Sequence, residues 1–306
     1  MNRKPFIIIS ILNTGIVIGL LVWVFFLQQK PSPTVTQKLN LNKPAEASVD
    51  RDTLLTQLSN EESYKNATQI LGRLSKLDAF DETALSALQK SAVTWSDDQS
   101  IEWPLQVFNL WKQQVASIDM FASTAESYIL DRETPIEVRD TVLRYITEGY
   151  ALYASREGAV LPTSSIEKFI TILETALNES DSSLRGTALL AYSYLLTKGT
   201  AGIVDRSRLL ARLDVAIASP EISEDTTLAI LAVIQQHRLR DYREYVIDCL
   251  TAGRSNSIIR QAILSLSQVG ESGDIALIQE NARNIPDHQK AVRMAEAVLL
   301  EGKDEG

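Results

Sequence analysis

An uncharged apolar stretch near the amino terminus, Phe6–Leu27, constrains this chain more than any other feature. It contains 22 residues without an acidic or basic side chain, and Arg3 and Lys4 precede it. As a helix it would extend roughly 33 Å at about 1.5 Å per residue, enough to cross a bilayer core of about 30 Å. We therefore predict one transmembrane helix at 6–27, with residues 1–5 as a short cytoplasmic tail.

The stretch is more typical of an uncleaved signal-anchor than of a signal peptide. A signal peptide has an apolar region of about 7–15 residues and a small-x-small cleavage site, whereas residues 27–31 read Leu-Gln-Gln-Lys-Pro. The positive charge of the short tail favours an amino terminus in the cytoplasm, although three lysines also follow the span. We expect a single-pass protein of the inner (cytoplasmic) membrane with an extracytoplasmic body, which would be periplasmic in a Gram-negative bacterium.

Within the span, Gly15 and Gly19 form a GxxxG pattern, and Asn13 lies two residues before it. Two glycines four positions apart share one helix face and allow a second helix to approach, while a buried Asn seeks a hydrogen-bond partner. Helix–helix pairing through this face is one interpretation. The other is that glycine is simply common in membrane helices.

Charge and residue usage exclude several classes of function. The 306-residue chain has a net charge of −9, which argues against nucleic-acid binding and against extended contact with anionic lipid. Cys249 is the single cysteine and only two histidines occur, His237 and His288, so a disulfide or a structural zinc site is not expected. We predict Cys249 to be a small buried side chain and His237 to lie at the surface. No phosphate-binding, dinucleotide or nucleophile-elbow motif occurs, and the sequence predicts neither a cofactor nor an enzyme.

Residues 28–49 are rich in Pro, Ser, Thr, Asn, Gln and Lys and predict a polar linker. From Asp50 onward, apolar residues recur at steps of three and four, and no segment alternates long enough to predict a strand. The runs predict about thirteen helices of roughly 10–20 residues, so the body is all-α. We divide it into helical hairpins at 50–131, repeats at 132–302 and a tail at 303–306.

Local signals predict where several helices begin and end. Thr134–Glu137 and Ser164–Glu167 have the residue types of capping boxes. Trp95–Trp103 is expected to be a loop that closes a helical hairpin, with Pro104 as the first residue of the next helix. Gly270 is expected to end a helix in the left-handed conformation.

Residues 255–279 read SNSIIRQAILSLSQVGESGDIALIQ. They place Ile263 at the centre of an apolar helix stripe, a turn at Gly270, and a returning helix that begins with Ile275. This segment resembles a HEAT repeat, a family whose units show an apolar–Arg pair, small apolar positions and a Gly turn. The resemblance implies a stacked α-solenoid that binds another macromolecule, and it implies no catalytic residues.

The apolar–Arg pair recurs at intervals of 46, 75 and 33 residues, which suit two-helix repeat units. The longest interval divides at Thr227-Leu228, where the arginine is missing. Weaker matches cover 134–146, 181–196 and 287–299, while 50–131 matches only as helical hairpins and a TPR-like bundle remains the alternative there. The pairs are Val138-Arg139, Leu184-Arg185, Ile259-Arg260 and Val292-Arg293.

Three functions compete. The leading hypothesis is a membrane-anchored extracytoplasmic scaffold or adaptor that binds a membrane-associated protein of an envelope assembly through its helical repeats. The alternative is a regulatory subunit that pairs through its transmembrane helix with an integral-membrane partner. A third is a carbohydrate-active enzyme of an α/α fold, whose acidic residues Asp97, Asp98 and Glu102 would lie beside Trp95 and Trp103.

One basic cluster is a candidate contact patch for an acidic partner protein. Because Asp241 and Glu244 are interspersed with it, a solvated helix end is the alternative. The members of the cluster are His237, Arg238, Arg240 and Arg243.

Overall fold

The computed structural model describes residues 50–61, 63–77, 86–87, 102–113, 118–156, 160–179, 183–198, 203–220, 222–250, 253–282 and 288–301. All of them belong to one compact unit of the chain, Val49–Gly306. The span at 6–27, with Asn13, Gly15 and Gly19, and the linker at 28–49 lie outside the described residues. Among the residues that are described, no helix combines the length and apolar character needed to cross a membrane.

All regular structure in the described residues is helical, which confirms the all-α prediction. There are thirteen α-helices and one 3₁₀ helix in these ranges, and their lengths run from 6 residues in α12 to 19 in α7. The elements are α2 (Arg51–Ser59), α3 (Tyr64–Leu74), α5 (Glu102–Gln113), α6 (Ile118–Leu130), α7 (Ile136–Ala154), α8 (Thr163–Asn178), α9 (Ser183–Thr197), α10 (Arg206–Ile217), α11 (Glu224–His237), η1 (Arg240–Tyr242), α12 (Arg243–Asp248), α13 (Asn256–Val269), α14 (Asp274–Ala282) and α15 (Gln289–Glu301).

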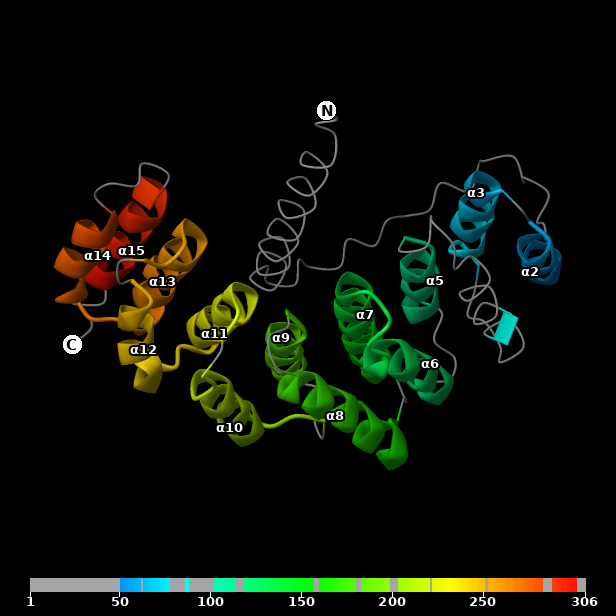
Figure 1. The fold of residues 1–306 in the computed structure, drawn as a ribbon, viewed down its shortest axis with the longest axis horizontal. Coiled ribbons are helices and arrows are strands. Elements are labelled where there is room, and N and C mark those ends of the chain that lie inside the picture. Colours follow the sequence, from blue (N-terminus) through cyan, green and yellow to red (C-terminus); the bar gives the residue numbers. More distant parts are fainter. Residues whose placement is uncertain are drawn as a thin grey trace. The chain divides into compact units, whose positions relative to one another are not determined.

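Alternate helices pack side by side. From α5 to α15, each odd-numbered helix contacts the next odd-numbered one, and the even-numbered helices pack against their odd-numbered neighbours (Figure 1). Each hairpin therefore covers the apolar side of the hairpin before it. This is a helical-repeat stack, the architecture that the stripes of apolar residues predicted.

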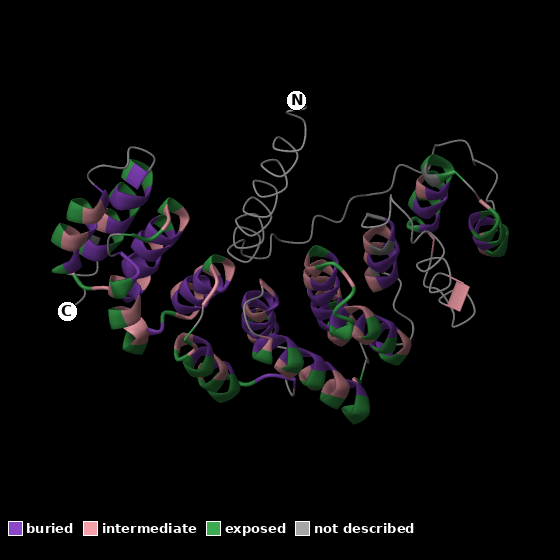
Figure 2. Cartoon of the chain, viewed as in Figure 1, coloured by how far each residue is buried: buried purple, intermediate pink, exposed green. Residues whose placement is uncertain are grey.

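The inner helices of the stack are buried on both sides, because each lies between two others. The buried positions of α9, α11 and α13 cover most of their circumference (Figure 2). Ile263 of α13 is fully buried, as its place in the apolar stripe predicted. Gly186 lets α9 approach α11 closely, since a Cβ atom there would lie 3.1 Å from the Cβ of Ala229.

Two of the recurring arginines have the same structural role. Arg139 of α7 donates from Nε to the carbonyl oxygen of Ile129 in α6 (2.8 Å) and contacts the carboxylate of Glu179, just after α8. Arg185 of α9 likewise donates from Nε to Leu177 in α8 (3.0 Å), and its guanidinium reaches Ser219, just after α10 (2.7 Å). Each arginine thus joins two successive even-numbered helices. Arg260 and Arg293 are exposed instead, so the shared pair does not have one role throughout.

Several predicted helix ends are wrong. The N-cap positions of α7 and α8 are Pro135 and Pro162, and neither helix has a side-chain cap. The hydroxyl of Thr134 donates to Asp131 (2.9 Å), and Ser164 is already the second residue of α8. Neither predicted capping residue therefore occupies the N-cap position of its helix.

Two further boundaries also differ from the prediction. Helix α5 begins at Glu102, so Pro104 is its third residue, which is allowed because the first-turn N–H groups have no intrahelical partner. Gly270 is extended, with φ −82° and ψ −179°. It is needed for space, since a Cβ atom would lie 2.5 Å from the carbonyl oxygen of Leu266.

Candidate partner-binding cavity

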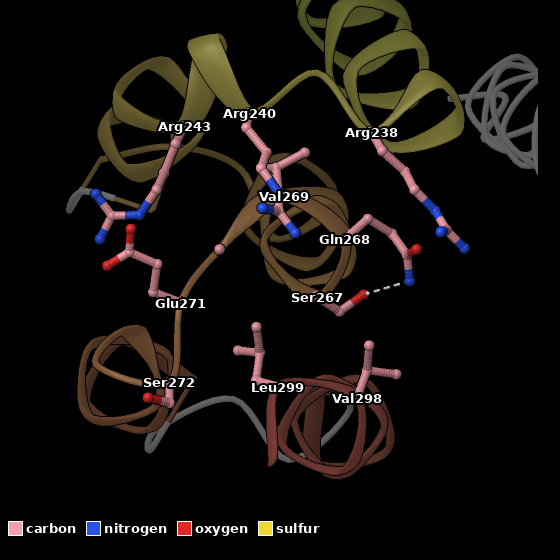
Figure 3. A pocket seen from close by; sticks show the side chains of 11 residues that line it. Arg238, Arg240, Arg243, Ser267, Gln268, Val269, Glu271, Ser272, Val298 and Leu299 are labelled. Atoms are coloured by element: carbon pink, nitrogen blue, oxygen red, sulfur yellow. Dashed lines mark hydrogen bonds between the residues drawn. The ribbon is translucent and has the colours of Figure 1, made fainter. Parts of the chain in front are cut away.

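A cavity of about 590 Å³ lies where the ends of three odd-numbered helices meet (Figure 3). Its walls come from the chain just after α11, from the end of α13 and the turn after it, and from the last turns of α15. Pockets that hold ligands commonly have volumes of roughly 300–1,000 Å³. The volume therefore suits a small molecule or a few side chains of another protein.

Arg238 lines this cavity from the end of α11. It is the C-cap residue of that helix and has φ 50° and ψ 51°, in the left-handed region. Among the described residues it is the only one besides a glycine with a positive φ. Glycine or asparagine usually occupies such a position, because a Cβ atom is crowded there.

Arg240 lines the cavity from the first position of η1. Both Arg238 and Arg240 are exposed, and neither guanidinium group has a hydrogen bond or ion pair with another residue of the described ranges. The cavity thus presents two cationic groups that are available to a ligand.

Arg243 also lines the cavity, but its side chain is engaged. Its Nε donates to Oδ2 of Asp274 (3.0 Å), a second guanidinium nitrogen contacts Oδ1, and a third lies 2.8 Å from a carboxylate oxygen of Glu244. Hydrogen bonding to Asp274 raises the pKa of Arg243. Asp274 is only 4% exposed and also accepts from the backbone N–H of Glu271 (2.8 Å). This arginine holds the start of α12 to the start of α14.

The remaining lining residues provide an apolar wall and further polar groups. Val298 of α15 is 42% exposed and Leu299 is buried beside it. Gln268 of α13 donates to the hydroxyl of Ser267 (3.3 Å). In Figure 3, Arg238 lies with Gln268 and Val298 at one side of the cavity, and Arg243 lies with Glu271 at the other. One of the two available arginines, Arg238, is therefore on the same side as the exposed valine.

His237 does not line this cavity. Its ring is half-buried against α9, with Nε2 2.9 Å from the hydroxyl oxygen of Ser193, so the prediction of a simple surface residue is wrong. Burial, with a smaller contribution from the charge of Arg206, lowers the pKa of His237. The predicted patch thus separates into one histidine in the helix interface and three arginines at the cavity.

Of the remaining candidate residues, only Trp103 and Cys249 have described side chains. Trp103 is fully buried, which leaves its ring unavailable to stack on a ligand, while Trp95, Asp97 and Asp98 lie outside the described residues. Cys249 is buried, as predicted. Within the described ranges, no group of three or more His, Cys, Asp or Glu side chains could hold a metal ion.

Sequence reasoning found the three arginines but missed Gln268 and Val298. These residues lie 30 and 60 positions beyond Arg238, and only the stacking brings them to it. A weak signal does exist for Val298, since it lies outside the buried stripe of α15, which consists of Ala291, Val292, Ala295 and Leu299.

Comparison with known proteins gives matches to solved structures alone. No protein-family model matches the chain, and no curated protein matches it. An engineered protein from the Northeast Structural Genomics Consortium is similar at 12% identity and a TM-score of 0.35, over 81% of this chain and 68% of that one. A designed armadillo repeat protein is similar at 14% identity and a TM-score of 0.31, over 82% of this chain and 100% of that one. A second engineered protein from the same consortium has 14% identity, a TM-score of 0.30, and coverages of 83% and 98%.

Proposed function

We propose that this chain is a membrane-anchored scaffold or adaptor that binds another protein through its stacked helices, without a catalytic step. The observation that carries the proposal is the cavity, whose lining includes the exposed residues Arg238, Arg240 and Val298. Arginine is enriched at the centres of protein interfaces, where it anchors a partner beside apolar contacts. A preformed opening with these groups supports protein binding.

The proposed anchor is Phe6–Leu27, with the amino terminus in the cytoplasm and the body outside it. The linker at 28–49 would let the body reach a membrane-associated partner. Confinement to one thin layer raises the effective concentration of the two proteins without any new contact. A weak interface on the helical stack would therefore be sufficient in the membrane.

Site-specific photo-crosslinking in the intact membrane tests the binding role. A photoreactive residue is placed in the full chain at three exposed positions, Leu152, Arg240 and Met294. We expect a discrete protein adduct from at least one of them. If none of the three gives a protein adduct while the protein is present at its normal level, the proposal fails.

Topology is tested separately with reporter fusions after Gly306. A reporter that is active only outside the cytoplasm should work, and one that is active only in the cytoplasm should not. The opposite pattern would overturn the orientation, and a mature amino terminus beyond Leu27 would overturn the uncleaved anchor.

The second candidate is a regulatory subunit that pairs through its membrane helix, which the pattern of Asn13, Gly15 and Gly19 favours. Replacing Phe6–Leu27 with an unrelated membrane helix of equal length distinguishes the two functions. A scaffold should keep its photo-crosslinked partner after this exchange. Loss of the partner, with expression and topology unchanged, would favour the subunit.

A further inference from the structure

We infer that the cavity binds an acidic segment of the partner protein, whose carboxylates pair with Arg238 and Arg240 while a neighbouring apolar side chain contacts Val298. The inference rests on the proposed function and names the chemistry of the partner. Three observations support it: the backbone of Arg238, the different states of the three arginines, and the composition of the opposite wall.

The backbone of Arg238 indicates that its side chain has a purpose beyond ending the helix. A residue with a Cβ atom is disfavoured at φ 50° and ψ 51°, where a glycine would fit without strain. A cation near the end of α11 interacts favourably with the helix dipole, but a lysine or arginine one turn earlier would do the same. The strained position instead places Arg238 in the lining of the cavity, at its rim beside Gln268 (Figure 3).

The three arginines are not equivalent. Arg243 is neutralised by the buried carboxylate of Asp274, and it serves to hold two helices together. Arg238 and Arg240 have no such partner among the described residues. A guanidinium group donates through a planar fork that matches a carboxylate, so two such groups in the lining of one cavity suit two acidic side chains.

The surroundings favour a short acidic segment over a long anionic polymer. Three exposed carboxylates lie near the arginines, from Asp241, Glu244 and Glu271. Together with the net charge of −9, they would repel a nucleic acid or an anionic lipid surface. A segment with only two carboxylates can avoid these groups.

The opposite wall adds selectivity for an apolar residue next to the acidic ones. Val298 is 42% exposed at the side of the cavity where Arg238 lies (Figure 3). An apolar side chain placed on it would be partly removed from water, which is favourable. The side-chain amide of Gln268 can pair with the backbone of the bound segment.

Selection from a displayed random peptide library, with the full chain held in detergent micelles, tests the inference. We expect enrichment of peptides in which adjacent Asp or Glu residues stand next to an apolar residue. For the best peptide, Arg238→Gly and Arg240→Gln should each raise the Kd about ten- to a hundredfold, as expected for lost charged hydrogen bonds. Arg260→Gln removes another exposed arginine, from α13, that does not line the cavity, and it should leave the Kd unchanged.

A measurement of stability separates recognition from folding. Because glycine relieves the strain at position 238, Arg238→Gly should leave the melting temperature unchanged or raise it. A clear fall in melting temperature together with lost binding would make Arg238 a structural residue and overturn its assignment. Arg240→Gln changes an exposed residue without altering a helix end and provides the independent variant.

The remaining outcomes decide between ligands and between proposals. Binding of a phosphoserine peptide more than tenfold tighter than its glutamate counterpart, or displacement of the peptide by inorganic phosphate at low millimolar concentration, would assign the cavity to phosphate and overturn the inference. So would selected peptides whose Kd is unaffected by both variants. If photo-crosslinking still captures a protein in these cases, the scaffold proposal stands and the acidic segment alone is wrong.

Discussion

Arg139 and Glu179 form an ion pair that joins the α6–α7 hairpin to the end of α8. One guanidinium nitrogen of Arg139 lies 2.9 and 2.7 Å from the two carboxylate oxygens of Glu179, while its Nε donates to the carbonyl oxygen of Ile129. Their side chains are only 8% and 17% exposed. Because most of the pair is removed from water, breaking it leaves a charge that solvent cannot fully stabilise.

Replacing Arg139 with methionine should therefore lower the free energy of unfolding by about 3–5 kcal/mol, because Glu179 and the carbonyl of Ile129 lose their donor. Urea unfolding of the full chain in micelles, followed by tryptophan fluorescence, measures the change. The matched control is Arg260→Met, which removes an exposed arginine and should change stability by less than about 0.5 kcal/mol. Equal effects of the two substitutions would contradict the proposed role of Arg139.

The recurring apolar–Arg pair predicted the repeat units but not the role of each arginine. Arg139 and Arg185 join successive even-numbered helices, whereas Arg260 is exposed at the equivalent place in the sequence pattern. Helix α12 has only six residues, and Arg243 at its start already connects it to α14 through Asp274. An arginine thus joins successive even-numbered helices both from α6 to α10 and from α12 to α14. In the second case it is Arg243 at the start of α12, and not the arginine of the apolar–Arg pair.

The cavity could also be predicted only in part, because the state of each arginine depends on residues that are distant in the sequence. Clustering of basic residues pointed to Arg238, Arg240 and Arg243, and all three line it. Which of them is available depends on Asp274, a residue 31 positions beyond Arg243 that the fold brings to it. The separation of His237 depends on where α11 ends, and the sequence at that point, Gln-Gln-His-Arg-Leu-Arg, contains no glycine to mark it.

A glycine in α7 supports a prediction about the packing between α6 and α7. A Cβ atom on Gly149 would lie 2.6 Å from a ring carbon of Phe121. Phe121 is fully buried, and its ring centroid lies 5.5 Å from that of Trp111, so it has little room to move. Gly149→Ala should therefore destabilise the fold by about 1–3 kcal/mol, measured as a lower midpoint in urea.

Gly72 of α3 provides the matched control for this substitution. Apart from its chain neighbours and the backbone of its own helix, no atom of the described residues lies within 4 Å of the place where its Cβ would be. Because alanine loses less backbone entropy than glycine on entering a helix, Gly72→Ala should leave stability unchanged or raise it by up to about 1 kcal/mol. If both alanines had the same effect, close contact with Phe121 would not be the reason for the glycine at 149.

The centre of the α13 stripe should be equally sensitive. Ile263 is fully buried between neighbouring helices, so Ile263→Ala should cost about 2–5 kcal/mol through lost burial and the cavity left behind. In a repeat stack the loss spreads to adjacent units, so the whole thermal transition should move. Met294→Ala, at a side chain that is 53% exposed, is the control and should leave the transition in place. An unchanged melting curve for Ile263→Asp would show that α13 has a different register.

The last prediction concerns pH and the half-buried imidazole of His237. Burial, with the charge of Arg206, lowers its pKa below the usual value of about 6.5, so the unfolded chain takes up this proton more readily than the folded one. Its contribution to stability is therefore complete above about pH 6.5 and is lost as the pH falls toward the lower folded pKa. Burial raises the pKa of Asp140, so protonation of that carboxyl group at low pH stabilises the folded state. Asp140 is present in both the natural chain and the His237→Gln variant, so its effect cancels when the two are compared. The free energy of unfolding, measured in urea from pH 7 to pH 5, should fall more steeply for the natural chain than for the variant, by at most about 1.4 kcal/mol per pH unit. Parallel slopes would mean that His237 titrates alike in both states, and burial of its ring would then not control its protonation.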